Sequence, residues 1–258
     1  MLANAFHRFF NALGFYTRLP CPKSVQFNAE HLNRASAFFP LMGIIVALLV
    51  YFIYASANMV FSHELSILLS MVASLLITGA FHEDGFADLC DGFGGGWSPE
   101  DILRIMKDSR LGTYGVAGLV FMLLLKWQSL TYISAASMCM VLIVAHSLSR
   151  AWALSLMMVL PYVQTDKDSK AKPIAQAWHK SDMILAWVSA LIPLAYFAYA
   201  QQSLELFTSL MIIGAIHWYW IQAWFKHRLN GYTGDALGAA QQIQEVTIYL
   251  AVAAYFTL

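Results

Sequence analysis

The feature that most constrains this chain is a series of apolar runs, each long enough to cross a lipid bilayer or nearly so. They begin near residues 38, 65, 113, 131, 183, 204 and 242. A membrane-spanning helix needs about 20 mainly apolar residues. Hydrophobic residues make up 59% of the chain and charged residues only 12%, against about 25% charged residues in ordinary proteins. The sequence therefore predicts an all-α, polytopic helical membrane protein with about seven transmembrane helices, in a range of about six to eight.

The stretch 131–162 has two interpretations, because polar residues including His146 and Arg150 interrupt it. It could form two short crossings or one long helix. With one helix, only Lys126 lies near the opposite face, and the segments rich in Lys and Arg share one side of the membrane: residues 1–37, 81–112, 163–182 and 226–241. The positive-inside rule then places that side in the cytoplasm. We therefore expect one long helix, with Arg150 on a cytoplasmic extension or at the interface.

Composition excludes several other classes of protein. A net charge of zero and a pI near 7.1 give no reason to expect nucleic-acid binding. The cysteines are odd in number and lack metal-type spacing, so we interpret them as packing residues: Cys21, Cys90 and Cys139. The N-terminal segment carries Arg8 and Arg18 but no uninterrupted apolar core, which predicts an attached interfacial amphipathic segment. Residues 1–258 are expected to form a single domain, with a cytoplasmic catalytic loop at about 81–112.

An acidic motif follows the second apolar run, with the sequence Gly-Ala-Phe-His-Glu-Asp-Gly-Phe-Ala-Asp-Leu-Cys-Asp-Gly at residues 79–92. At 100° per residue, Asp84, Asp88 and Asp91 fall within an arc of roughly 60° on one helix face. Such carboxylates repel one another, which indicates a compensating cation. Oxygen ligands without a Cys or His set favour Mg²⁺, Mn²⁺ or Ca²⁺ over Zn²⁺. A solvated acidic helix end is the simpler alternative, and Glu83 points about 100° away.

A second polar segment is expected to return toward this acidic face. Glycines at 94–96 end the first helix, and Ser98 and Pro99 begin a short one. The segment that follows contains Lys107, Asp108, Ser109 and Arg110. A carboxylate, two cations and a hydroxyl suit a phosphate ester held on a metal ion. We favour Arg110 over Lys107 as the essential cation, because Arg binds phosphate through two parallel hydrogen bonds; ordinary positive-inside anchoring is the alternative for both.

Further candidates for substrate binding are scattered along the chain. Arg150 lies in an apolar helix, where an arginine is costly unless it is paired, functional or reaches the headgroups. Asp235 lies in a glycine-spaced segment, residues 231–240, and could bind a metal, a ribose or a base, or simply cap a helix. His82 beside the aspartates could be a ligand, a base, an orienting group or a structural residue. Lys180 is a further cation for phosphate oxygens.

Three motifs in this order resemble the bacterial cobalamin synthase family, the adenosylcobinamide-GDP ribazoletransferases. They are Phe-His-x-Asp-Gly-x-Ala-Asp-x-Cys-Asp-Gly at 81–92, Ile-Met-Lys-Asp-Ser-Arg-Leu-Gly-Thr at 105–113 and Thr-Gly-Asp-x-Leu-Gly-Ala at 233–239. The segments Phe-x-Thr-Arg-Leu-Pro at 15–20 and Phe-Pro-Leu-x-Gly at 39–43 extend the resemblance over nearly the whole chain.

The resemblance implies a Mg²⁺-dependent transferase of the bacterial inner membrane. Such an enzyme joins adenosylcobinamide-GDP to α-ribazole or its 5′-phosphate, forms adenosylcobalamin or its phosphate, and releases GMP. The acidic motif of the family corresponds to Asp84, Asp88 and Asp91, and its Lys-Asp-Ser-Arg motif to residues 107–110. Asp108 would complete the metal site or accept the hydroxyl proton. Position 83 is commonly apolar in the family, so Glu83 is a departure. Lipid is an expected partner and homo-oligomerisation a possible one.

Two other functions compete with this one. Asp88-x-x-Asp91-Gly92 is similar to the motif of CDP-alcohol phosphotransferases of phospholipid synthesis, but the Ala-Arg that should follow is replaced by Gly94 and Gly95. A cation-coupled transporter would use the acidic cluster as an ion site. Transport favours carboxylates at the middle of the membrane, whereas these follow an apolar run at its end.

Overall fold

The structure is a computed structural model that describes residues 2–163 and 179–257. Within these residues the regular structure is helical, apart from one bridge between Tyr162 and Tyr232. The helices are α1 (Leu2–Tyr16), α2 (Ala29–Asn33), η1 (Ala35–Phe38), α3 (Phe39–Ala57), α4 (His63–Thr78), α5 (Phe81–Gly95), α6 (Pro99–Met106), α7 (Thr113–Thr131), α8 (Ala135–Ser155), η2 (Leu156–Met158), α10 (Lys180–Ala200), α11 (Leu204–Leu229) and α12 (Gly234–Thr257).

The all-helical, polytopic class is confirmed, with five or six candidate spans, so the larger number lies at the lower end of the expected range of six to eight. In the described part of the chain, five helical segments are long and apolar enough to cross a bilayer: Ala35–Ala57, Thr113–Thr131, Ala135–Met158, Lys180–Ala200 and Leu204–Leu229. The pair α4 and α5 counts as a sixth if it is one broken span, since it bends by 89°. The apolar run near 242 lies inside α12, whose polar residues exclude it from this count.

The stretch 131–162 forms one helix continued by a short 3₁₀ turn, as expected: α8 and η2 run from Ala135 to Met158. The expected position of Arg150 is wrong. Arg150 is only 2% exposed and lies inside the protein, not on a cytoplasmic extension or at the interface. Lys126, expected near the far face, lies in the last two turns of α7, where it is buried and forms an ion pair with Glu245 of α12.

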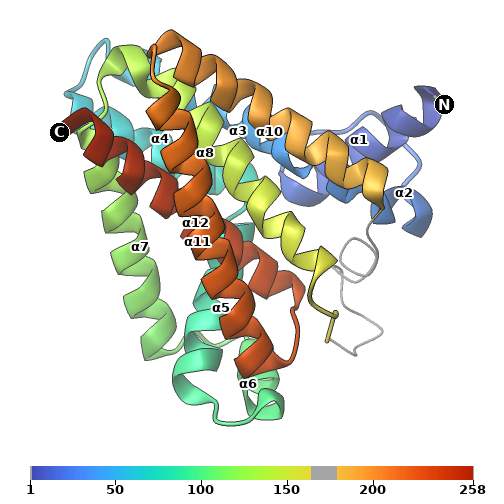
Figure 1. Ribbon diagram of the computed structural model, residues 1–258. Coiled ribbons are helices and arrows are strands. Elements are labelled where there is room, and N and C mark those ends of the chain that lie inside the picture. Colours follow the sequence, from blue (N-terminus) through green and yellow to red (C-terminus); the bar gives the residue numbers. More distant parts are fainter. Residues whose placement is uncertain (1, 164–178, 258) are drawn as a thin grey trace.

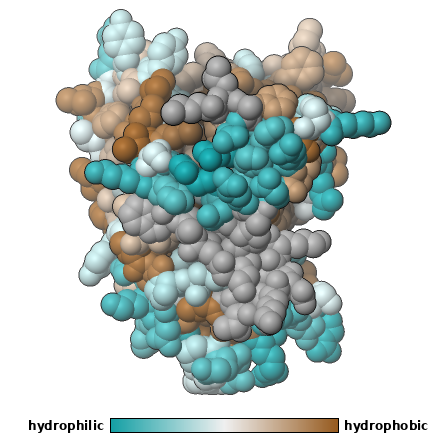
Figure 2. Space-filling model, turned by 90° about the vertical axis from the view of Figure 1, so that its right-hand side faces the viewer, coloured by the Kyte–Doolittle hydropathy of each residue, from teal (hydrophilic) through white to brown (hydrophobic). Residues whose placement is uncertain are grey.

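Helix α8 is the centre of the bundle (Figure 1). It packs against α3, α12 and α10, and 83% of its span is buried, compared with 22% for α11. The turns at 58–62, 132–134 and 201–203 lie together at the upper left of Figure 1 and contain no charged residue. The opposite side carries α1, α2 and the first turns of α10. Figure 2 views that side, where hydrophilic residues gather in a band.

The acidic helix α5 is fixed at both ends. It begins after a sharp bend at Gly79 and Ala80, which have φ angles of 68° and 55° in the left-handed region. At its other end the Arg228 side chain donates to the carbonyls of Phe93 (2.9 Å) and Gly96 (2.8 Å), the unpaired acceptors of a helix C-terminus. The body of α5 packs between α12 and α7. These contacts hold the helix rigidly, with its aspartates directed to one side.

Candidate active site

Helix α5 has an acidic side and a buried side. Asp84 is exposed and Asp88 half-buried, whereas Glu83 on the opposite side is buried. At Gly85 the helix touches the start of α12: a Cβ atom at that position would lie 2.7 Å from the carbonyl oxygen of Asp235. This close approach adds the Asp235 carboxylate to the group. The negative charges of Asp84, Asp235 and Asp91 all act on Asp88. We call the four aspartates, Asp84, Asp88, Asp91 and Asp235, the acidic face.

Asp91 connects the acidic face to the second polar segment. Its two carboxylate oxygens accept hydrogen bonds from the backbone N–H groups of Gly112 (2.7 Å) and Gly115 (2.8 Å). These groups belong to the N-terminus of α7, where an anion is favoured by unpaired N–H groups and by the helix dipole. The predicted return of residues 107–115 to the acidic helix is therefore confirmed. One of the three predicted metal ligands is already engaged as a helix cap.

The predicted catalytic residues lie in the loop that Asp91 holds. Arg110 and Asp108 pair with each other through two side-chain contacts, Nη2 to Oδ2 at 2.6 Å and Nε to Oδ1 at 3.0 Å. Hydrogen bonds from the Arg110 side chain, and then from its backbone, lower the pKa of Asp108 to about 2. The Arg110 side chain is 88% exposed. Lys107 and Ser109 are exposed beside the pair, so the surface of the loop carries two cationic side chains and a hydroxyl.

The acidic face fits a hard divalent cation in chemistry but not in its present side-chain conformations. Carboxylate oxygens are the ligands that Mg²⁺ prefers, and no lysine or arginine of the described residues forms an ion pair with Asp84, Asp88 or Asp235. Across residues 2–163 and 179–257, however, no three His, Cys, Asp or Glu side chains converge closely enough to hold a metal ion.

Three other predicted substrate-binding residues lie away from the acidic face. His82 is buried, with its ring roughly parallel to those of Tyr16 and Phe39. Arg150 lies 5.3 Å from the centre of the Phe39 ring and donates to the carbonyl oxygen of His146 at 2.8 Å. Lys180 is exposed at the start of α10, which packs chiefly on α8, η1, α3 and α11 rather than α5. The structure therefore brings Asp235 to the aspartates but not these three.

The sequence analysis missed a buried network behind α5. Lys126 donates to Gln242 (2.6 Å) and to Glu245 (2.8 Å), and Gln242 donates to Glu83 at 3.1 Å. Arg150 lies 3.6 Å from the other oxygen of Glu245. We call this set the buried charge network. Its sequence signals are the isolated Arg150 in an apolar helix and the polar run Gln241-Gln242-Ile243-Gln244-Glu245 inside another apolar helix.

Comparison with known proteins agrees with the motifs that converge here. The sequence model of the cobalamin-5-phosphate synthase family matches residues 8–253. Proteins named adenosylcobinamide-GDP ribazoletransferase are similar over most of their length. The one from Shewanella frigidimarina is 43% identical over 95% of this chain and 94% of the relative. The one from Vibrio cholerae is 42% identical over 96% and 93%, and that from Shewanella oneidensis 45% identical over 93% and 91%.

No solved structure matches the chain. The family assignment therefore rests on the sequence matches, which cover both motif segments of the site and the start of α12. A match of this extent, at more than 40% identity, includes every helix that shapes the acidic face. This chain belongs to the cobalamin-5-phosphate synthase family.

Proposed function

We propose that this protein is an adenosylcobinamide-GDP ribazoletransferase. It transfers the corrinoid phosphoryl group of adenosylcobinamide-GDP to a hydroxyl group of α-ribazole or α-ribazole 5′-phosphate and releases GMP. The names of the relatives support the substrates. The observation that carries the chemistry is the acidic face: aspartates gather where no lysine or arginine of residues 2–163 and 179–257 forms an ion pair with Asp84, Asp88 or Asp235, beside a loop that carries Lys107 and Arg110.

In this proposal Asp84 and Asp88, together with Asp235, hold Mg²⁺. When bound, the ion neutralises charge on the diphosphate, and this is its contribution to the chemistry. Asp91 positions the 107–112 loop through its bonds to Gly112 and Gly115. The exposed guanidinium of Arg110 contacts phosphate oxygens, with Lys107 and Ser109 beside it.

Asp108 has an orienting role in this scheme. A carboxylate with a pKa of about 2 is a weak proton acceptor near neutral pH. Its paired contacts with Arg110 instead hold the guanidinium in one orientation until phosphate oxygens replace the carboxylate. We therefore assign Asp108 to positioning Arg110 and not to accepting the hydroxyl proton.

We further propose that the acidic face opens to the cytoplasm, in the bacterial inner membrane. The end of the bundle that holds the uncharged turns at 58–62, 132–134 and 201–203 is then periplasmic. The Lys- and Arg-rich segments within residues 2–37, 81–112 and 226–241 lie at the other end, as the positive-inside rule requires, and most of the segment 163–182 lies outside the described residues.

The test uses purified protein in detergent or nanodiscs, supplied with adenosylcobinamide-GDP and α-ribazole. We expect GMP and a cobalamin in equal amounts, only with Mg²⁺ present, and none after chelation with EDTA. Asp84→Asn should abolish both products, whereas Glu100→Gln, an exposed carboxylate of α6, should not. Product from CDP-diacylglycerol and an alcohol, or cation-coupled uptake into proteoliposomes without GMP release, would replace this proposal with one of its rivals.

A further inference from the structure

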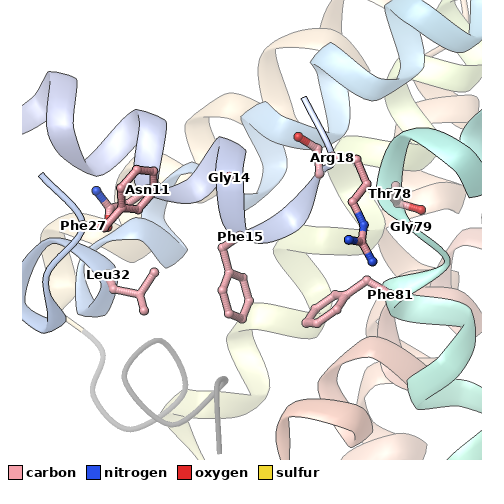
Figure 3. Close-up of a pocket in the computed structure, with 10 residues that line it drawn as sticks. Asn11, Gly14, Phe15, Arg18, Phe27, Leu32, Thr78, Gly79 and Phe81 are labelled. Atoms are coloured by element: carbon pink, nitrogen blue, oxygen red, sulfur yellow. The ribbon is translucent and has the colours of Figure 1, made fainter. Parts of the chain in front are cut away.

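A cavity of about 580 Å³ lies beside the acidic helix, between α1, the segment that follows it, and the bend that joins α4 to α5 (Figure 3). Its volume falls within the range of about 300–1,000 Å³ that is usual for small-molecule sites. The lining residues come from both sides of the bend and include Phe15, Arg18, Phe27, Thr78 and Phe81. None of the functions assigned so far uses this cavity.

The walls of the cavity are mainly aromatic. Phe15, Phe27 and Phe81 supply three rings, and those of Phe15 and Phe81 meet edge to face with 5.3 Å between their centres. Figure 3 shows the Arg18 side chain extending past Gly79 toward the Phe81 ring. Arg18 is the one charged residue among the described residues of the lining. The apolar rings suit a flat, uncharged aromatic ring, and the single cation suits an anionic group attached to that ring.

Most polar side chains of the lining are already hydrogen-bonded. The Thr17 and Thr78 hydroxyls donate to the carbonyls of Leu13 and Ser74, at 2.6 Å and 3.0 Å. The Asn11 amide nitrogen donates to the carbonyls of His7 and Gln26, and its Oδ1 is the one buried lining acceptor without a partner among the described residues. The described lining residues include no carboxylate to accept the paired N–H groups of a guanine. A base without N–H donors, such as a substituted benzimidazole, needs no carboxylate partner there.

The cavity is connected to the acidic face through Phe81. Phe81 is the first residue of α5, and at 100° per residue it lies about 60° from Asp84 and 20° from Asp88 on the same side. The helix rise places these carboxylates about 4.5 Å and 10.5 Å further along. A second cavity, of about 40 Å³, shares Phe15 and Phe81 with the first and reaches Gly234 and Gly238, on either side of Asp235.

We propose that this cavity binds the benzimidazole base of α-ribazole, and that Arg18 binds the 5′-phosphate when the nucleoside carries one. The inference rests on the proposed function, because it assigns the acceptor substrate to a place beside the acidic face. Phe27 and Phe15 then hold the base, and the ribose extends along α5 toward Asp84 and Asp88. The nucleotide-activated corrinoid is left to approach from the 107–112 loop.

Equilibrium binding to the detergent-solubilised protein tests the proposal, with α-ribazole, α-ribazole 5′-phosphate and GMP as separate probes. Phe27→Ala removes a ring that is 60% exposed, so it leaves no cavity in the core. It should weaken both ribazole ligands about tenfold, as loss of one stacking partner does. Phe61→Ala, an exposed phenylalanine in the turn at the opposite end, is the matched control and should change nothing. Phe27→Tyr should bind both ligands as the unaltered protein does.

Arg18→Gln separates the two parts of the ligand. It should weaken α-ribazole 5′-phosphate about tenfold at low salt and leave free α-ribazole unchanged. In the transfer assay, Phe27→Ala should raise the KM for ribazole without changing the KM for adenosylcobinamide-GDP. Unaltered ribazole binding by Phe27→Ala, or tighter binding of GMP than of ribazole in this cavity, would overturn the inference. If the unaltered protein transfers the corrinoid group, such a result leaves the proposed function intact; no transfer at all refutes the proposed function itself.

Discussion

Two groups of charged side chains lie on opposite sides of one short helix. Glu83 and Asp84 are neighbours in sequence, yet Glu83 joins the buried charge network and Asp84 the acidic face. In the network, opposite charges meet: Glu245 lies 2.8 Å from Lys126 and 3.6 Å from Arg150. In the acidic face, like charges meet, and in the part of the chain that the structure describes no lysine or arginine forms an ion pair with Asp84, Asp88 or Asp235.

This difference indicates what each group does. Charges in a low-dielectric interior are tolerated when they neutralise one another and are hydrogen-bonded, as Lys126, Gln242 and Glu245 are. Such a group holds α7, α8 and α12 in register. Repelling carboxylates at an accessible surface lower stability, so their presence indicates a ligand that compensates them. The network is structural and the acidic face functional, and each half of that statement can be tested by substitution.

The largest effect on stability is expected in the buried charge network. Glu245→Gln keeps the shape of the side chain but leaves Lys126 and Arg150 buried without their shared carboxylate. Removing one partner from a buried charge group destabilises a protein by about 3–5 kcal/mol. A marked fall in the Tm of the detergent-solubilised protein would show it. Glu205→Gln, at an exposed position in the first turn of α11, should leave the Tm unchanged. A stable Glu245→Gln protein that has lost only turnover would contradict the structural role.

The acidic face is expected to show the opposite pattern: a large loss of turnover with little change in Tm. Asp88→Asn should lower turnover by roughly 100- to 1,000-fold, because a group that stabilises transition-state charge is lost, equivalent to about 3–4 kcal/mol. Its Tm should be equal or slightly higher, since repulsion from Asp84, Asp91 and Asp235 is relieved. The assay is GMP release beside a thermal scan, with Glu100→Gln as the control. Retained turnover together with a lower Tm would make Asp88 a structural residue.

Sequence reasoning predicted the acidic face better than the network, for a physical reason. Asp84, Asp88 and Asp91 are close in sequence, so helix periodicity alone brings them together. The pairing of Asp91 with Gly112 and Gly115 also follows from a short connection. Lys126, Arg150 and Glu245 come from three helices separated by long stretches of chain, and only tertiary packing joins them. Each was therefore interpreted singly, with Arg150 expected on a cytoplasmic extension or at the interface and Lys126 near the opposite face.

Prediction of the fold has the same limit: features set by local sequence were predicted, and features set by tertiary contacts were not. Long apolar runs identified the spanning helices and the single helix α8, because length and hydropathy are local properties. The 89° bend between α4 and α5 depends on the left-handed conformations of Gly79 and Ala80. Only the glycine is marked in the sequence, and an alanine with positive φ is maintained by surrounding contacts. The count of about seven crossings missed this bend and the polar interior of α12.

Asp91 lies on the acidic face, but both of its carboxylate oxygens are hydrogen-bonded, as the charged groups of the buried charge network are. Its substitution therefore tests whether a residue of the acidic face can be structural. Asp91→Ala removes the acceptor for the Gly112 and Gly115 N–H groups and should destabilise the protein by about 1–2 kcal/mol, as the loss of a helix cap does. Asp91→Asn keeps one acceptor oxygen and should have an intermediate Tm. Equal thermal stability of Asp91→Ala and the unaltered protein would place Asp91 with Asp84 and Asp88 as a purely functional carboxylate.

The smallest effect on thermal stability is expected at the exposed pair of Asp108 and Arg110. The pKa of Asp108, about 2, is below its ordinary value of 3.8, so the pair stabilises the folded protein above about pH 4 and the contribution is lost as the pH falls toward 2. Arg110→Gln should therefore lower the Tm slightly at pH 5–7 and have no effect near pH 2, because exposed ion pairs contribute little. A difference in Tm that grows as the pH falls would contradict this expectation.

Asp108→Asn should leave the shape of the pH–rate profile between about pH 5 and 9 unchanged, since that carboxyl group is ionised throughout. Loss of an acidic limb from the profile would restore Asp108 as the proton acceptor.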